Sequence, residues 1–230
     1  MTLDVDDPDA LRAQEAAYAD LADAVRHLVD ATVRTEATDE RAAEVAMQVR
    51  ALTATLLDEA QDGPLGLQLC SDGRLRDHGN PAVGMRNPIA PPLVIEHGED
   101  GASVSTRFEL GAAYEGPPGH VHGGISAMVL DQLLGTTAAL RGKPGLTAYL
   151  NLTYRQRTPL GPLACEAWVA EASEWKTLVK GHLLDEDGRV TVEAEGLFVV
   201  PTWARDALSI PQSDAADFPA PTPAATTEKE

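Results

Sequence analysis

The feature that most constrains the fold is an apolar segment, ISAMVLDQLLGTTAAL, at residues 125–140. Its apolar residues fall on nearly every side of a helix, a pattern typical of a helix buried on most of its surface. The residues on either side alternate in the manner of strands, with a period of two. A helix of this kind needs a sheet to cover it, so we expect an α+β domain.

The expected strands flank the apolar helix on both sides. Before it, residues 93–110 predict two strands joined by a turn at 99–101. After it, short turns separate a series of strands, with a strong hairpin signal at 185–188. These later strands are predicted at 146–156, 163–172, 175–184 and 189–200.

The first sixty residues have a different pattern. Residues 8–61 predict helix, with a break near 35–39 where Thr38 or Asp39 can cap a second helix. Repeated Gly and Pro then indicate a linker. We therefore expect four parts: an acidic helical extension at 1–62, a linker at 63–84, a globular domain at 85–205 and a disordered tail at 206–230.

The composition limits the function classes. A formal net charge of -18 argues against a surface for nucleic acid or anionic membrane. No apolar run is long enough to span a membrane, and the N-terminus lacks a signal pattern, so a cytoplasmic protein is expected. Cys70 and Cys165 have no metal-type spacing; buried free thiols are favoured over a disulfide. The single histidines His78, His97 and His182 are interpreted as ordinary surface or strand residues.

A carboxylate interrupts the apolar helix at Asp131. It shares a helix face with small and apolar residues, including Met128 and Leu134, so it would be desolvated. A desolvated carboxylate costs stability unless something uses it. Gly123 and Gly124 come just before this helix. The N–H groups of a first helical turn lack intrahelical partners and lie at the positive end of the dipole, where they can stabilise an oxyanion. His122 adds a possible donor.

The stretch GHVHGGISAMVLDQLLG, residues 119–135, resembles the active-site segment of hotdog-fold acyl-CoA thioesterases, in the phenylacetate-pathway and thioesterase-superfamily-member branch. A subgroup pairs the His and Asp with a Thr sixteen residues further on, which is Thr147 in LTAYLNLTYRQRTPLG. EGPPG, before the His, is also similar to that subgroup. The resemblance covers roughly residues 85–203. Other branches place an active-site Asn six residues before the His, where this chain has Gly116.

The resemblance implies a hotdog fold, in which an antiparallel sheet wraps around the helix at 125–140. It also implies a homodimer or homotetramer with the site between subunits, and hydrolysis of an acyl-CoA to free acid and coenzyme A within lipid metabolism. Asp131 would be general base or nucleophile, Gly124 with Gly123 or His122 would hold the carbonyl oxygen, and Thr147, from the other subunit, would position water. No cofactor is implied.

Other residues complete the expected substrate site. Met128 and Leu134 are predicted to line the acyl tunnel. The stretch from residue 132 to 165 has no acid, and its basic residues are either a solvated patch or a coenzyme A phosphate site, since Arg can bind two phosphate oxygens. These residues are Arg141, Lys143, Arg155 and Arg157.

Alternatives remain open at each of these residues. Asp131 alone could be a buried acid paired with a core Arg, and Thr147 an ordinary strand residue. His120 and His122 could make backbone hydrogen bonds; with an acid they could bind metal, but no further ligand is suggested, so no metal is expected. The rival functions are a hotdog enoyl-CoA hydratase or dehydratase and a non-catalytic acyl-CoA-binding protein.

Overall fold

The structure is a computed structural model that describes residues 8–69, 75–140 and 145–207. Its residues form two compact units. The first unit comprises Met1–Leu93 with Leu110–Ala113, and the second comprises Val94–Glu109 with Tyr114–Glu230. The four-part division made from the sequence uses other boundaries and stays a prediction.

The first unit contains the two predicted helices, α1 (Pro8–Arg34) and α2 (Asp39–Leu57). The break between them is confirmed, and the Thr38 side chain caps α2 by accepting a hydrogen bond from the Arg41 N–H. The segment predicted to be an irregular linker contains a minimal antiparallel pair, β1 (Gln68–Leu69) with β2 (Leu75–Arg76). No described helix is long and apolar enough to cross a membrane.

Inside this unit, buried charged groups connect α1 to β2 and to the residues that follow it. Arg76 Nε lies 2.8 Å from Glu15 Oε1, an ion pair without the alignment of a hydrogen bond. His78 Nε2 lies 3.9 Å from the same oxygen, and all three residues are buried. The interpretation of His78 as an ordinary surface residue is therefore wrong. Nothing in its sequence neighbourhood indicated that Glu15, sixty-three positions earlier, would be beside it.

The burial of His78 predicts a pH-dependent stability of the first unit. Burial, followed by the charge of Arg76, holds the pKa of His78 below its usual value. The unfolded chain therefore binds a proton more readily than the folded one, so stability is present above about pH 6.5 and is lost as pH falls through the lower folded pKa. Hydrogen-exchange protection of α1, corrected for intrinsic rates, should fall between pH 7.5 and 5.5. A His78→Gln variant should show a flatter dependence; an unchanged slope would contradict the prediction.

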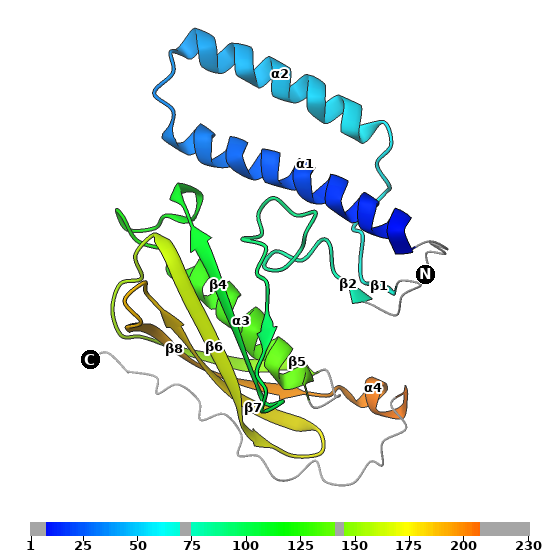
Figure 1. Ribbon diagram of the computed structural model, residues 1–230, viewed down its shortest axis with the longest axis vertical. Coiled ribbons are helices and arrows are strands. Elements are labelled where there is room, and N and C mark those ends of the chain that lie inside the picture. Colours follow the sequence, from blue (N-terminus) through cyan, green and yellow to red (C-terminus); the bar gives the residue numbers. More distant parts are fainter. Residues whose placement is uncertain (1–7, 70–74, 141–144, 208–230) are drawn as a thin grey trace, which may run out of the picture. The chain divides into compact units, whose positions relative to one another are not determined.

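The second unit is built on a six-stranded sheet with the order β3-β4-β6-β7-β8-β5 (Figure 1). Its sequential pairs run antiparallel, as the short turns predicted. The strands are β3 (Glu96–His97), β4 (Ser103–Leu110), β5 (Leu146–Tyr154), β6 (Gly161–Ala172), β7 (Lys176–Leu184) and β8 (Val190–Val199). A short 3-10 helix, η1 (Ala112–Tyr114), and a C-terminal helix, α4 (Thr202–Ala207), complete the described elements; neither was predicted.

The apolar helix is α3 (Gly123–Ala139), which packs along one face of this sheet against β5, β6, β7 and β8 (Figure 1). Leu134, fully buried, fills space left by two glycines: a Cβ at Gly181 or Gly196 would lie 2.8 or 3.1 Å from its methyl carbons. Phe198 approaches Gly135 in the same way. The sheet wrapped on one helix confirms the predicted α+β hotdog fold with an N-terminal helical extension.

Candidate active site

A narrow turn of residues 114–122 leads into the N-terminus of α3. The His122 N–H donates to the Tyr114 carbonyl and the Gly116 N–H to the His120 carbonyl, both at 2.9 Å. A Cβ placed on Gly116 would lie 2.7 Å from the His122 Cα and 3.0 Å from its Cβ. Only glycine fits at this approach, so the structure explains why residue 116 carries no side-chain amide.

His122 is the N-cap of α3. Its Nδ1 accepts the Gly124 N–H at 3.0 Å, so in the neutral ring the hydrogen is on Nε2. His120 has the opposite arrangement, because its Nδ1 lies 2.7 Å from the Pro118 carbonyl oxygen, which can only accept. The two histidines of the HVH pair therefore present different groups: an N–H from His122 and a lone pair from His120.

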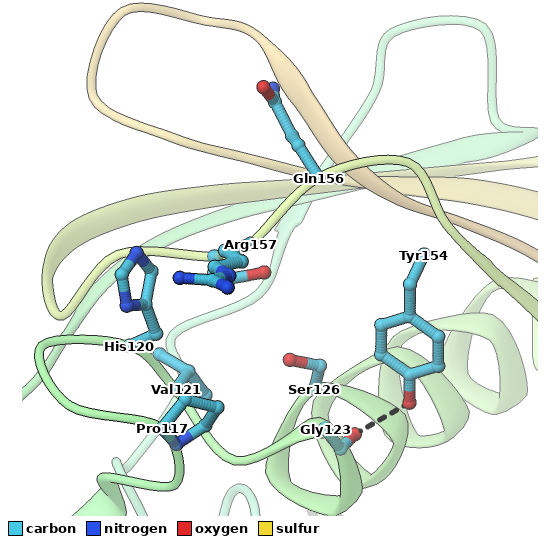
Figure 2. Close-up of a pocket in the computed structure, with 9 residues that line it drawn as sticks. Pro117, His120, Val121, Gly123, Ser126, Tyr154, Gln156 and Arg157 are labelled. Atoms are coloured by element: carbon cyan, nitrogen blue, oxygen red, sulfur yellow. Dashed lines mark hydrogen bonds between the residues drawn. The ribbon is translucent and has the colours of Figure 1, made fainter.

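The same hydrogen bond changes which glycine can hold a substrate oxygen. The prediction named the Gly124 N–H as the donor to the carbonyl oxygen, but this N–H already donates a hydrogen bond to His122 Nδ1. Among the described residues, the Gly123 N–H makes no hydrogen bond. The Tyr154 hydroxyl donates to the Gly123 carbonyl at 2.8 Å and so holds the peptide plane that follows (Figure 2). Gly123 thus replaces Gly124 as the available donor.

Asp131 and Thr147 meet within one chain. The Thr147 hydroxyl donates to Asp131 Oδ1 at 3.0 Å. Thr147 was expected to come from another subunit and to position water, which stays a prediction; within one chain its hydroxyl bonds the Asp131 carboxylate. The cause is that β5 lies alongside α3, with Thr147 near the middle of the helix and Tyr154 at its start.

A register shift in β5 aims Thr147 at the helix. In the pairing of β5 with β8, Thr147 is opposite Phe198 and Tyr149 is opposite Leu197, so one extra residue stands between them. Beyond the bulge Tyr154 is opposite Val192, on the same face of β8 as Phe198. Bulges re-aim side chains in this way, and here two residues seven apart both face α3.

A cavity of about 370 Å³ opens beside the start of α3 (Figure 2). Gly123, Tyr154 and the buried Ser126 form its helix side, while Arg157 and His120 lie opposite. Gln156 also borders it, but its side chain turns away and donates to the Val190 carbonyl. The remaining lining residues are Pro117, Val121 and Thr158. An oxygen bound here would meet positive potential from both sides.

The predicted substrate residues separate into distinct groups. Arg157 lines the cavity, whereas Arg155 pairs with Glu193 at 2.7 Å, a hydrogen bond that holds the pKa of Arg155 above and that of Glu193 below the usual values. Met128 is half-buried, while Leu134 belongs to the core. The predicted residues Arg141 and Lys143, like Cys70, lie outside the described residues.

Other reactive groups do not join the site. Cys165 is a free thiol, and burial raises its pKa far above the usual range, so it stays protonated and inert. In the part of the chain that the structure describes, no group of three or more His, Cys, Asp or Glu side chains is placed to hold a metal ion.

Sequence reasoning missed two residues beside Gly123. Tyr154 lies thirty-one positions away, and only strand packing brings it to the glycine carbonyl. Ser126 could have been found, since residues three apart are neighbours on a helix surface and it follows Gly123 by three.

The chain is similar to known thioesterases in sequence and in structure. The Thioesterase superfamily profile matches residues 118–192. The mouse (Mus musculus) protein "Acyl-coenzyme A thioesterase THEM5" is 28% identical over 138 residues, 59% of this chain and 55% of that protein. Mouse "Acyl-coenzyme A thioesterase THEM4" is 43% identical over 53 residues, 23% of each chain. This chain therefore spans about half or less of the curated relatives it matches.

A solved structure gives a longer match. The crystal structure of RHA08564, described as a thioesterase superfamily protein, is 36% identical with a TM-score of 0.71, over 79% of this chain and 90% of that one. The match thus extends well beyond the helix and strands that carry the His-Gly-Gly turn and Asp131. With a matching fold, a matching profile over the site and this extent of identity, the chain belongs to the thioesterase superfamily.

Proposed function

We propose that the protein hydrolyses acyl-CoA thioesters to a free acid and coenzyme A. The observation that carries this proposal is the hydrogen bond between Asp131 on α3 and Thr147 on β5, together with a cavity at the first turn of α3 that Gly123 lines. A carboxylate that can take a proton or attack a carbonyl, and a donor for the developing oxyanion, are the two elements of acyl transfer. The names of the THEM5 and THEM4 relatives agree with this chemistry.

Two routes use the same groups. In the first, Asp131 takes a proton from water, and the hydroxide attacks the thioester carbonyl carbon; the C–S bond breaks and the thiolate of coenzyme A is protonated. In the second, the Asp131 carboxylate attacks and expels the thiolate, and water then hydrolyses the mixed anhydride. In both, Thr147 orients the carboxylate. Besides the substrate, the proposed reaction needs only water.

A second copy of the chain is part of the proposal. Gly123 and Asp131 are eight residues apart on α3, about 12 Å along a helix axis. A reacting carbonyl must lie within about 3.5 Å of its attacking group, so this separation favours a site that combines Gly123 of one copy with Asp131 of another. β5 is an edge strand with Leu146 and Tyr154 more than half exposed, and pairing would cover it. We propose a homodimer, with a homotetramer as its further assembly.

The coenzyme A moiety would lie near Arg157, with Arg141 and Lys143 as further candidates from the sequence. Arg155 is a weaker candidate because Glu193 already neutralises it. Met128 would contact the acyl chain; Leu134 would do so only if the core rearranged. We also propose that the protein is cytoplasmic and that its reaction belongs to lipid metabolism.

The deciding experiment is a panel of acyl-CoAs of different chain length, including phenylacetyl-CoA, with released thiol read by a disulfide dye. Thiol release above the blank supports the proposal. A parallel assay with crotonyl-CoA detects loss of the enoyl absorbance without thiol release, which would indicate a hydratase. Binding of acyl-CoA with neither reaction would indicate a binding protein.

Thr147 offers a test of the carboxylate pair. Thr147→Val removes the hydroxyl that orients Asp131, and we expect kcat to fall by about 10-fold to 10²-fold. Thr147→Ser keeps the hydroxyl and should retain most activity. Thr153→Val is the matched control, because Thr153 is exposed and its β8 partner, Glu193, lies on the other face of the sheet. Equal losses in Thr147→Val and Thr153→Val would contradict the assigned role.

A further inference from the structure

The cavity at the start of α3 contains a buried hydroxyl that the mechanism above does not use. Ser126 is 1% exposed and lines the cavity, and Figure 2 shows its hydroxyl directed into the open space. No hydrogen-bond partner for it lies among the described residues. Other buried hydroxyls nearby are satisfied: Thr137 donates to the Leu133 carbonyl at 2.8 Å, and Thr158 to Thr191 at 2.9 Å.

Ser126 and Gly123 face the cavity together. Residues three apart lie on the same side of a helix, and helical side chains lean toward the N-terminus. The Ser126 hydroxyl therefore extends toward the end of α3 at which the Gly123 N–H is also unoccupied. The Ser126 hydroxyl belongs to a buried residue and the Gly123 N–H to a half-buried one, and neither bonds a described group. Both donors are therefore available to one acceptor bound in the cavity.

We propose that the Ser126 hydroxyl is the second donor to the thioester carbonyl oxygen, beside the Gly123 N–H. This inference rests on the proposed thioesterase function. An oxyanion is usually held by more than one donor. Of the other donors that line the cavity, the Tyr154 hydroxyl already bonds the Gly123 carbonyl, and Arg157 lies on the opposite side, where the proposal places the coenzyme A moiety. The Gly124 N–H is bonded to His122, and the Thr158 hydroxyl to Thr191. His122 carries an N–H but does not line the cavity.

The step balances without a further reactant. When the carboxylate or water attacks the carbonyl carbon, the π electron pair of the C=O bond moves to oxygen. Ser126 donates a hydrogen bond to that oxyanion and keeps its proton. The pair returns as the C–S bond breaks and the coenzyme A thiolate leaves. Because the bond strengthens as charge develops, its loss should lower kcat more than it changes KM.

A structural role predicts the opposite pattern. A hydroxyl that packs or pairs within the protein stabilises the fold, and its removal lowers the melting temperature. Ser126 has no partner to lose, so Ser126→Ala should leave the melting temperature unchanged. Thr137→Val is the matched control, since it removes a buried hydroxyl from the same helix that is already satisfied by the Leu133 carbonyl.

The test measures kcat, KM and melting temperature for three variants on the best substrate of the acyl-CoA panel. We expect Ser126→Ala to lose about 10²-fold in kcat with KM changed by less than about 3-fold. Ser126→Thr, which keeps the hydroxyl, should recover most of this loss, and Thr137→Val should retain the wild-type kcat.

Each result decides a separate point. Wild-type kcat in Ser126→Ala, while the wild-type protein is active, overturns the role of Ser126 and leaves the proposed function intact. A loss of kcat accompanied by a lower melting temperature and not recovered in Ser126→Thr also overturns it, in favour of packing. If the wild-type protein releases thiol from no acyl-CoA, the proposed function and this inference both fail.

Discussion

Asp131→Asn is expected to lower kcat for acyl-CoA hydrolysis by at least about 10³-fold while the protein stays folded. An asparagine can neither take a proton from water nor attack a carbonyl carbon. Its Oδ1 can still accept the Thr147 hydroxyl, so the contact that ties α3 to β5 survives. Steady-state thiol release gives the activity, and the melting temperature with the circular dichroism spectrum gives the fold.

A charge-matched control separates chemistry from a general change in electrostatics. Glu186→Gln removes one negative charge from an exposed turn of the same unit and should leave kcat unchanged. Near wild-type turnover in Asp131→Asn would rule out both the general-base and the nucleophilic route, because each needs the same carboxylate.

The second large effect is expected at Gly116. An added Cβ would lie 2.7 Å from the His122 Cα, a distance at which backbone must move. Gly116→Ala should therefore destabilise the protein by about 2 kcal/mol, a typical cost of overpacking. It should also displace His122 and the first turn of α3; displacement by about 1 Å can lower kcat by about 10²-fold. Urea unfolding and thiol release measure the two effects.

The control for this variant lies in the same turn. Gly119 has φ of 72° but open space around its Cβ position, so Gly119→Ala strains the loop without touching His122. It should cost about 1 kcal/mol with a much smaller loss of kcat. If both alanine variants lowered kcat equally, strain in the turn rather than the approach to His122 would be the cause.

The helices and strands of the second unit followed from local patterns. Alternation set the strands from residue 146 to 200, and the apolar segment after Gly124 required burial on most sides. Each of these signals acts over a few neighbouring residues. The minimal strands β1 and β2 and the short helix α4 were not predicted, because two to six residues carry too little pattern.

The candidate active site also has features that follow from local sequence and features that follow only from the tertiary structure. The local patterns of the sequence determined an α+β domain, a buried helix that carries Asp131 and a His-Gly-Gly turn before it, because each depends on neighbouring residues. The hotdog fold was predicted from the resemblance of that segment to a known family. Only the tertiary structure decided which donors are available. His122 occupies the Gly124 N–H, Tyr154 fixes the Gly123 carbonyl, and a bulge in β5 turns Thr147 toward its own Asp131. These contacts depend on strand register and on which hydrogen bonds are already made, and neither is encoded in residue spacing.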